Sequence, residues 1–567
     1  MIVGEAWGEN ERARNLPFVG ASGKELEIML AEAGIDPAQC FYTNLINEKP
    51  NANDMRAFLL PNQRGEKGLF NDGVRPSDRL LTGLQRLDRQ IEAVKPQIII
   101  TVGNWPMWYL TGKGNVKTAK GYKLPTGIDT WRGSQLFLRP SPFRDMCDIP
   151  VLPVYHPAAI LRNYSWRKIT VQDLTRATDF LEGTSWKDLG ELDRLNIVMP
   201  SPAELGRFID SWIKQPEIPI VCDLETKQFR IHIVGLTQDG KTNIAIPFFH
   251  ITANGFRPTY QPLAFRQIYM HLHRLFHAPG MRFRGQNWMY DIQFITRFFF
   301  TTPVCDWDSM IGQHVAFPAL RKALDYQASM YCKHYVYWKD DLKESTDNMD
   351  TTKACLYNCE DLWRTHEIIA AQEIMLPALG KLSQFHRRMR VFPVLVKMMN
   401  NGVLVNKQMK ERQRTQLFHT ALEISNWLEE VMPDRVKDKR KGAKPWFSSN
   451  AQLAPILYDR LKLKPIINRK TGTRSTDKEA LVALSERYPQ WSGLLSAILL
   501  YRSVRVVAGN ILSSKLEVDG RIRTSYSLAG PDTYRLSSSK NVWDGGGNLQ
   551  NIMRDREDMD LLEQDLI

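Results

Sequence analysis

Two carboxylates, Asp223 and Glu225, end an apolar run that reads IPIVCDLET over residues 218–226. Residues i and i+2 of a β-strand point to the same side, so both acids would emerge together at the end of a buried strand. Hard divalent cations such as Mg²⁺ prefer carboxylate oxygens, and two such ions about 3.5–4 Å apart can activate water and hold the leaving oxygen of a phosphodiester. Taken alone, the pair more often marks a solvated strand end.

Two later segments change this interpretation. Asn287 and Asp291 lie in RGQNWMYDIQFITRFF, and Tyr357 and Asp361 lie in LYNCEDLWRTHEII; both stretches have the apolar pattern of a helix. The residues of each pair are four apart and share one helix face. Asp291 and Asp361 can complete a cluster of four acids. Tyr357 can orient the attacking water, and Asn287 can steady its own turn. A capping Asn, a core Tyr and surface acids explain each residue singly, but the order and separations favour a cluster.

The segments DLE, NWMYD and YNCED resemble the three motifs of the DEDD-type 3′–5′ exonucleases, in the Tyr-bearing subtype found beside family-A DNA polymerases. The resemblance covers residues 190–380. It implies a ribonuclease H-like domain with a mixed sheet flanked by helices, and removal of nucleotides from a 3′ end. It also implies two Mg²⁺ or Mn²⁺ ions at the four acids. Asp239-Gly240 predicts a hairpin turn within this domain. Asp308 falls where the family often has a supporting Asp, and we give it a structural role.

Composition limits the class of protein. At 567 residues the chain is too long for one core and should hold about three or four domains. No stretch approaches the ~20 apolar residues of a membrane span, and no signal peptide is recognised, so we expect no membrane partner. Seven scattered Cys favour reduced thiols and a cytoplasmic location, the host bacterial cytoplasm if a phage encodes the chain. The net charge of +13 suits DNA as a partner, although a basic protein without a nucleic-acid role stays open.

The C-terminal third has a mainly helical pattern, with amphipathic stretches over residues 389–400, 406–432 and 478–513. The basic interruption PDRVKDKRKGAKPW is either a phosphate-contacting loop or a solvated linker. Beyond the helices, DGRIRTSYSLAGPDTYRLSSS concentrates hydrogen-bond donors that can hold phosphates without reading sequence. These donors are Arg521, Arg523, Thr524, Ser525, Arg535, Ser537 and Ser538. Gln550 and Asn551, in NLQNI, can reach base or sugar edges near a primer end.

Five segments from FSSNAQLAPILYDRLKLKP to NLQNI resemble, in family order, the thumb and early palm of family-A DNA polymerases. Tyr534 stands where the family usually has Gly, and the insertion NVWDGGG precedes NLQNI. The segment DMDLLEQDLI resembles the palm strand that bears the first catalytic acid, which is Asp565 by position; the alternative is an acidic tail. The second palm acid and the fingers helix have no counterpart before residue 567. We therefore expect no polymerisation by this chain alone, and a second chain that carries the rest of palm and fingers is one interpretation.

The N-terminal third alternates strands and helices, which predicts a parallel α/β sheet. Sites in such sheets lie at the carboxyl ends of the strands, where Glu5, Asn44 and His156 would gather. Asn44 can pair with a pyrimidine edge, and Phe18 can stack on a flipped base. Glu5 can position water, and His156 can stabilise charge on the leaving base. On spacing alone, a satisfied strand-end His and a capping Asn are the simpler interpretation.

The segments GEAWGENE, PFVGASGKEL, TNLI and HPA resemble the motifs of the uracil-DNA glycosylase superfamily, nearest its iron–sulfur members. The resemblance covers residues 1–180. Those members hold a cluster through four Cys, one of them just after the TN motif, but Glu48 occupies that place here and no N-terminal CxxC exists. We therefore predict no iron–sulfur cluster. Trp7 and Ala158 also replace the usual Pro and Ser, which leaves uracil binding without excision as an alternative.

The expected chain is thus an α/β multidomain protein. It should have a parallel α/β glycosylase-like domain over residues 1–183, an exonuclease domain over 190–380, a mainly helical thumb over 381–515 and a partial palm over 516–567. Three hypotheses remain: the leading portion of a family-A polymerase with proofreading exonuclease activity on single-stranded 3′ ends and primer-template DNA; a repair protein that couples a glycosylase to an exonuclease; or the DNA-binding half of a split polymerase.

Overall fold

Runs of buried aliphatic residues form the first sheet of the computed structural model, which describes residues 1–63, 65–190, 194–340, 350–432, 445–468, 472–509 and 512–549. All four residues of β3 (Ile99–Val102) are buried, as is typical of a parallel strand covered on both faces. The sheet order is β2-β1-β3-β7-β6, and only β6 runs antiparallel to its neighbour. The other strands are β1 (Ile2–Ala6), β2 (Tyr42–Ile46), β6 (Leu136–Phe137) and β7 (Pro150–Val154).

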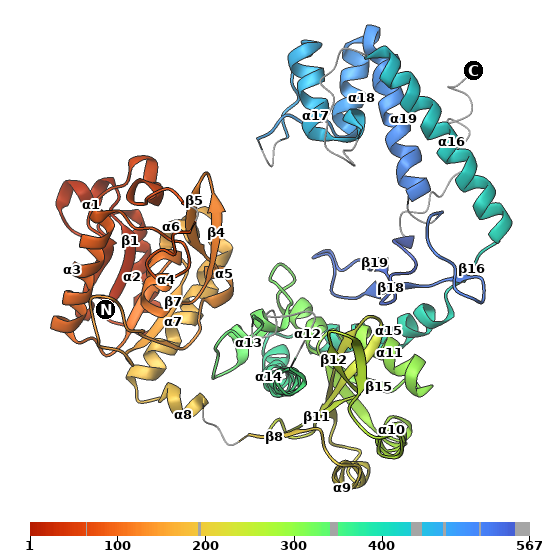
Figure 1. Cartoon of the computed structure of the whole chain (residues 1–567), viewed down its shortest axis with the longest axis horizontal. Helices are drawn as coiled ribbons and strands as arrows, with labels where there is room; N and C mark the ends of the chain where they lie inside the picture. Colours follow the sequence, from red (N-terminus) through yellow and green to blue (C-terminus); the bar gives the residue numbers. More distant parts are fainter. Residues whose placement is uncertain are drawn as a thin grey trace. The chain divides into compact units, whose positions relative to one another are not determined.

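Helices cover both faces of this sheet, because successive strand residues enter opposite cores. Ile99 packs in one core and Ile100 in the other. The first core takes in α3 (Asp78–Val94) and α4 (Asn104–Thr111), and the second takes in α2 (Ala21–Glu32) and α7 (Arg167–Leu181) (Figure 1). The remaining elements are α1 (Glu9–Arg14), β4 (Asn115–Ala119), β5 (Tyr122–Thr126), α5 (Ile128–Trp131), α6 (Pro157–Arg162) and α8 (Trp186–Gly190). The predicted parallel α/β domain is confirmed.

The second sheet is mixed, as expected, with the order β15-β14-β9-β10-β11-β8. Strands β9, β10 and β11 form an antiparallel meander, whereas β14 runs parallel to β9 and β8 runs parallel to β11. The predicted hairpin turn at Asp239-Gly240 joins β10 to β11, and Gly240 has a φ of 68°. The strands are β8 (Leu195–Val198), β9 (Ile220–Lys227), β10 (Arg230–Thr237), β11 (Thr242–Pro247), β14 (Arg282–Gly285) and β15 (Val304–Asp308).

The long helix α14 (Thr351–Ala378) packs across β9, β10 and β11. Its position brings the helix that carries Tyr357 and Asp361 against the central strands of the sheet. The other elements of this part are α9 (Pro202–Ile213), β12 (Phe249–Thr252), β13 (Gly255–Pro258), α10 (Pro262–His277), α11 (Trp288–Phe299), α12 (Ser309–Ala316) and α13 (Leu324–Tyr331). Both sheets belong to one compact unit, Met1–Met389.

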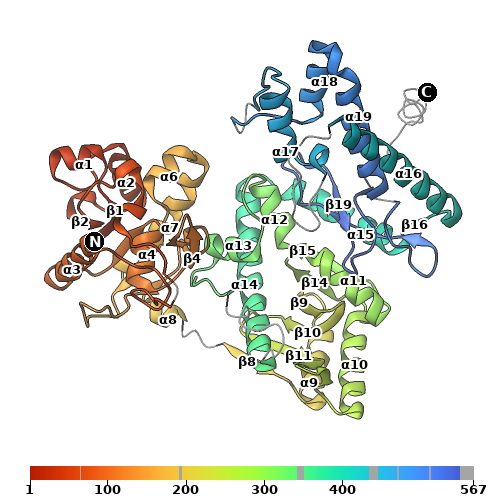
Figure 2. The ribbon, with the colours of Figure 1, turned by 45° about the horizontal axis from the view of Figure 1, so that its top comes forward.

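The second compact unit, Arg390–Ile567, is mainly helical in its described part, as predicted. Helices α16 (Lys407–Val431) and α19 (Ser492–Gly509) lie side by side, and α18 (Lys478–Arg487) joins them around an aliphatic core (Figure 2). The single stretch predicted over residues 478–513 is wrong: it is divided at Tyr488, which precedes Pro489 and has a non-helical ψ of 75°, as expected where a following proline disfavours the helical conformation. The remaining elements are α15 (Leu382–Asn401), which crosses the boundary between the units, β16 (Val403–Leu404), α17 (Asn450–Pro455), β17 (Arg521–Ile522), β18 (Thr524–Ser527) and β19 (Ser537–Lys540).

One helix in the described residues, Pro489–Gly509, is long and apolar enough to cross a membrane by length and composition, contrary to the expectation from sequence. Its Leu494, Leu495 and Ile498 are buried in the core of the second unit. Packing against α16 and α18 accounts for the buried part of its apolar surface.

Candidate active site

The structure brings together three of the four acids expected to form a cluster. Asp223 and Glu225 project from the same side of β9, and Asp361 comes from α14, which crosses that strand. Carboxylate oxygens of the three residues all lie within 4.8 Å of one another. Hard oxygen donors at this spacing are the ligands that Mg²⁺ and Mn²⁺ prefer, so the residues fit the predicted ions.

The fourth acid, Asp291, lies beside the cluster in the first turn of α11. Its Oδ1 accepts a hydrogen bond of 3.2 Å from the backbone N–H of Leu224, between the two acids of β9. Burial, reinforced by the charge of Asp223, raises the pKa of Asp291 well above its ordinary value. Asp291 is thus tied to the strand that carries the other acids and contributes to the same negative field.

Burial raises the pKa of every acid in the cluster, and repulsion between the acids adds to this effect at Asp223, Glu225 and Asp291. Burial, followed by the charge of Asp361, raises the pKa of Asp223 to about 7. Burial, followed by the charge of Asp223 and then that of Asp361, raises the pKa of Glu225 well above its usual range. Burial also raises the pKa of Asp361, against the opposing charge of Lys339. Buried acids whose pKa values are raised in this way are typical of a functional site that binds a cation.

Three residues at the cluster were missed from sequence. Lys339 Nζ lies 2.6 Å from Asp361 Oδ2, and Trp338 Nε1 donates a hydrogen bond of 2.7 Å to Asp361 Oδ1. Asn358 Nδ2 donates a hydrogen bond of 2.8 Å to Asp223 Oδ2. Asn358 could have been found because it lies three residues before Asp361 in a helical motif, and i, i+3 residues share a face. The only signal for the other two was the aromatic and basic run HYVYWKDD.

Tyr357 lies at the cluster as expected. The Lys339 ammonium is 4.8 Å from the centre of its ring. Burial, then the charge of Asp361, raises the pKa of Tyr357 above its ordinary value, so the side chain stays a phenol. A phenol can donate or accept a hydrogen bond to water but cannot serve as a base near neutral pH.

Asn287 and Asp308 hold the fold around the cluster. Asn287 was expected on the face of a helix, but this is wrong: it is the residue before α11, with a left-handed φ of 54°. Its backbone N–H donates to Asp308 Oδ1 at 3.2 Å, and the N–H of Trp288 donates to Asp308 Oδ2 at 2.9 Å. Asp308 also accepts from Met310 N–H at 2.9 Å at the start of α12. It therefore joins two helix N-termini, in keeping with the structural role given to it.

A second group of predicted residues gathers at the carboxyl end of the first sheet. A Cβ added to Gly4 would meet Asn44 Oδ1 and lie 2.7 Å from Phe18 Cζ, so both side chains converge on β1. A Cβ added to Gly103 would lie 2.7 Å from Glu5 Oε1 and 3.4 Å from His156 Cβ. Sequence reasoning thus identified two pairs of residues that meet at neighbouring strands of the first sheet, Asn44 with Phe18 and Glu5 with His156.

Burial shifts the pKa values of both Glu5 and His156. Burial raises the pKa of Glu5 to about 7, against backbone hydrogen bonds from Trp105 and Asn104. Burial lowers the pKa of His156 to about 4, and its Nδ1 accepts a hydrogen bond of 3.1 Å from Ala158 N–H. The neutral imidazole therefore carries its proton on Nε2, where it can donate to a ligand oxygen.

Comparison with known proteins finds family matches for two separate segments of the chain. The family model of the uracil-DNA glycosylase superfamily matches residues 1–181, and that of DNA polymerase family A matches residues 420–563. A type-4 uracil-DNA glycosylase of Saccharolobus solfataricus is 33% identical over 184 residues, which are 32% of this chain and 70% of that protein. The DNA polymerase of Bacillus phage SP01 is 21% identical over 636 aligned positions, which cover 95% of this chain.

The chain belongs to the uracil-DNA glycosylase superfamily through residues 1–181 and carries a segment that matches DNA polymerase family A over residues 420–563. It spans 62% of the length of the phage polymerase. Among solved structures, the POL domain of Pol1 from M. smegmatis, in complex with DNA primer-template and dNTP, aligns with a TM-score of 0.46 and 18% identity, over 63% of this chain and 56% of that one.

In the polymerase region, Arg523, one of the predicted phosphate donors, is engaged within the protein. Its guanidinium lies 2.6 Å from Asp519 Oδ2 and 3.0 Å from Glu517 Oε2, and its Nε donates to Asn400 O at 2.6 Å. Arg521 Nη1 donates to the backbone oxygens of residues 401 and 402. A DNA phosphate would have to compete with these acceptors for Arg523.

Other predicted contacts of the polymerase region are only partly described. Thr524 and Ser525 lie on β18, Ser537 and Ser538 lie on the paired strand β19, and Arg535 lies in the connection between the two. Gln550, Asn551, Asp565 and residues 433–444 of the basic interruption lie outside the described residues.

Proposed function

We propose that this chain, as part of a family-A DNA polymerase, hydrolyses DNA from a 3′ end at the acid cluster of Asp223, Glu225, Asp291 and Asp361. The observation that carries the proposal is the convergence of three carboxylates within 4.8 Å, from a strand and a helix far apart in sequence. A structural ion network would pair each acid with a cation. In the described residues, Lys339 is the one cation in an ion pair with these acids. The remaining negative charge favours a cation site.

The residues at the cluster would have three separate roles: binding of cations, orientation of Asp223 and positioning of water. The four acids would hold two Mg²⁺ or Mn²⁺ ions, which supply activation of water and stabilisation of charge at the scissile phosphate. Asn358 fixes the orientation of Asp223 through its 2.8 Å hydrogen bond. Tyr357 remains a phenol, so it positions the attacking water by a hydrogen bond and does not take its proton.

An exposed aromatic residue in the turn that follows the strand of Asp223 and Glu225 suits a single-stranded substrate. Phe229 lies four residues after Glu225, in the two-residue turn that joins β9 to β10, and is 55% exposed. Both central residues, Gln228 and Phe229, have left-handed φ values of 46° and 64°. Such strain in residues with side chains is more common at functional sites. Stacking of a base on Phe229 would help hold an unpaired 3′ end, because every base presents a π-face.

The raised pKa values predict that cation affinity depends on pH. Below about pH 7 the ion-free cluster keeps a proton on Asp223 that a bound cation has to displace. Mn²⁺ affinity of the full chain should therefore rise by up to about tenfold per pH unit between about pH 5 and pH 7. Calorimetric titration in two buffers of different ionisation enthalpy would also detect the released proton. A pH-independent affinity would contradict the protonation assigned to Asp223.

The gathering of Glu5, Phe18, Asn44 and His156 supports a second function, recognition of uracil in DNA. The neutral His156 would donate from Nε2 to an oxygen of the flipped base, and Asn44 would read the pyrimidine edge. The raised pKa of Glu5 leaves a mixture of acid and carboxylate near neutral pH, and only the carboxylate can draw a proton from water. Excision of uracil and binding of uracil without excision both fit this arrangement of residues.

The uracil proposal predicts a specific loss. Asn44→Ala should lower excision of uracil from a labelled oligonucleotide by roughly a hundredfold, as is usual when one hydrogen-bonding group is removed from a preorganised site. If the domain binds without excising, the same variant should lose its preference for uracil over thymine in a competition assay. Asn51→Ala, at an exposed position of the same domain, is the matched control. A wild-type protein with neither excision nor preference would refute uracil recognition.

The whole protein's role follows from these sites. We place it with DNA, both primer-template and single-stranded 3′ ends, in the cytoplasm of a bacterial cell, which is the phage host if a phage encodes the chain. Coupled glycosylase and exonuclease activity would instead define a repair protein. Excision of uracil from a labelled oligonucleotide, together with degradation of 5′-labelled single-stranded DNA, would distinguish this case. A second chain that carries the rest of palm and fingers stays a prediction of the sequence.

A further inference from the structure

Residues 332–340, here called the strap, dock on the glycosylase-superfamily domain although they follow α13 of the second sheet's domain. The backbone N–H of Gln135 donates to Tyr335 O at 2.8 Å, and Tyr335 N–H donates back to Gln135 Oε1 at 2.9 Å. Tyr337 N–H donates to Ser134 Oγ at 3.3 Å. Reciprocal bonds between buried groups fix the strap in register against residues 134 and 135, because a lost partner would leave a buried polar group unsatisfied.

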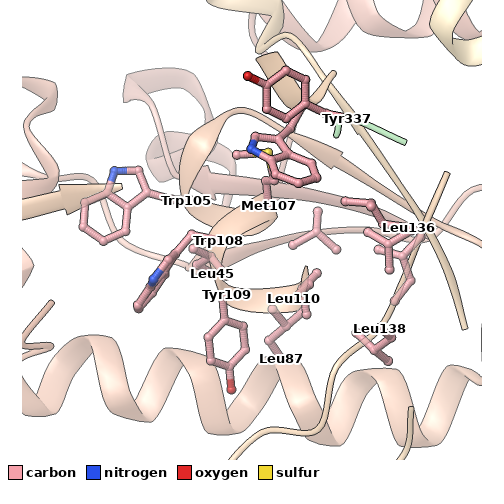
Figure 3. Close-up of a cluster of buried hydrophobic side chains, with 14 of the residues drawn as sticks. Leu45, Leu87, Trp105, Met107, Trp108, Tyr109, Leu110, Leu136, Leu138 and Tyr337 are labelled. Carbon is pink, nitrogen blue, oxygen red and sulfur yellow. The ribbon is translucent and has the colours of Figure 1, made fainter. Parts of the chain in front are cut away.

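Side chains of the strap complete the core of that domain. Tyr335, Tyr337 and Trp338 are buried in the cluster that contains α3, α4 and β6, and Figure 3 shows Tyr337 among its side chains. Tyr337 also meets Trp131 edge to face, with ring centres 5.1 Å apart. The strap is therefore held by apolar burial as well as by hydrogen bonds.

The opposite side of the strap is held by α14, the helix that bears Asp361. The buried Arg364 donates from Nη1 to His334 O at 3.2 Å and from Nη2 to Val336 O at 3.3 Å. Its guanidinium also lies 4.1 Å from the centre of the Trp338 ring. The strap thus connects the glycosylase-superfamily domain directly to the helix turn beside the acid cluster.

At its end the strap delivers Lys339 to the cluster. The ammonium makes a 2.6 Å ion pair with Asp361 Oδ2, and the side chains of Lys339 and Asp361 are 25% and 6% exposed. Trp338 occupies the other oxygen, Oδ1. Both oxygens of one predicted ligand are therefore engaged by the strap. A divalent cation at Oδ2 would lie against a positive ammonium, which repels it strongly in a poorly solvated site.

We propose that the strap makes cation binding at the acid cluster depend on the glycosylase-superfamily domain. Lys339 neutralises Asp361 in the ion-free site and leaves Oδ2 when a divalent ion takes that oxygen. Docking of the strap on residues 134 and 135 returns Lys339 to Asp361 and so opposes the ion. Because such coupling is reciprocal, any change that loosens the docked strap raises cation affinity, and cation binding loosens the strap. The inference rests on the proposed function, since it requires that the acids bind cations.

The first test is Mn²⁺ binding by the full chain, followed by electron paramagnetic resonance of the free ion. Lys339→Met removes the charge but keeps much of the apolar stem, and it should raise Mn²⁺ affinity by about tenfold, within the range usual for coupled sites. Lys333→Met, an exposed lysine of the same strap, should leave the affinity unchanged. Unchanged or weaker Mn²⁺ binding by Lys339→Met would overturn the proposal.

The second test concerns the distant domain. Gln135→Ala removes the acceptor for Tyr335 N–H and should raise Mn²⁺ affinity several-fold, but this gain should disappear in the Lys339→Met background. Equal gains in both backgrounds, or no gain in either, would show that the domain does not act through Lys339. Ser134→Ala, which removes only the acceptor of Tyr337 N–H, serves the same purpose if thermal unfolding shows that Gln135→Ala is misfolded.

Asp361→Asn separates this inference from the proposed function. If Asp361→Asn loses Mn²⁺ binding while Lys339→Met keeps wild-type affinity, the acids bind cations and only the role of the strap is wrong. If Asp361→Asn binds Mn²⁺ as the wild type does, the acid cluster is not the cation site and both proposals fail.

Discussion

Replacement of Asp223 and Glu225 by Ala is expected to abolish 3′–5′ hydrolysis by the full chain while DNA binding is retained. The two acids face the same point from one strand and share it with Asp361 within 4.8 Å, so the double variant loses two of the three converging ligands. The fall in rate should exceed about 10²–10³-fold, the loss that follows removal of one donor from a preorganised site. Degradation of 5′-labelled single-stranded DNA with Mg²⁺ measures it, and fluorescence anisotropy without Mg²⁺ measures binding.

Glu217→Ala is the matched control, because Glu217 is an exposed acid shortly before the same strand. It should degrade DNA at the wild-type rate, and a chelator should stop both proteins. Equal degradation by the Asp223→Ala, Glu225→Ala double variant and the wild type would refute the proposed function. Loss of DNA binding along with hydrolysis would point to a folding defect, which thermal unfolding would reveal.

Loss of a buried arginine between the two sheets of the first unit should have the largest effect on stability. Arg132 is 1% exposed, its Nη1 lies 2.7 and 2.8 Å from the two oxygens of Asp173, and its Nη2 donates to Ser329 Oγ of α13 at 2.7 Å. Arg132→Met would leave the Asp173 carboxylate buried with only Arg176, 3.7 Å away. Breaking such a pair costs about 3–5 kcal/mol in the free energy of unfolding.

The loss should also depend on pH. Burial raises the pKa of Asp173 even beside Arg132, and removal of the arginine would raise it further. A carboxyl group whose folded pKa is raised loses stability as pH rises through that pKa, so the effect of Arg132→Met should be larger at pH 8 than at pH 5. Urea unfolding of the first unit, followed by tryptophan fluorescence at both pH values, measures this.

An exposed ion pair provides the comparison. Arg274 and Asp210 form a salt bridge with side chains 48% and 57% exposed, and Arg274→Met should cost less than about 1 kcal/mol. If Arg132→Met were no more destabilising than Arg274→Met, the Arg132–Asp173 pair would not hold the first unit together. Stronger destabilisation at pH 5 than at pH 8 would contradict the charge assigned to Asp173.

Local periodicity explains which parts of the site could be predicted from the sequence. The two-residue period of a strand places Asp223 and Glu225 on one side of β9, and the helical period places Tyr357 and Asp361 on one face of α14. Strand ends of a parallel sheet gather at one edge, so Glu5, Asn44 and His156 were also predictable as neighbours. Asn287 was placed within the helix and not at the cap position just before it, because a left-handed cap residue and a first-turn residue have similar sequence signals.

The sequence by itself therefore determined that Asp223 and Glu225 share one side of a strand, that Tyr357 and Asp361 share one helix face, and that Glu5, Asn44 and His156 lie at strand ends of the first sheet, since each depends on short-range spacing. Only the tertiary structure decided that residues 332–340 pack in the core of the preceding domain and deliver Lys339 to Asp361. Tyr335 and Gln135 are 200 residues apart, and a hydrogen bond across that separation leaves no periodic trace in either segment. Contacts of this kind are set by how two finished surfaces fit, which depends on the shape and burial of both.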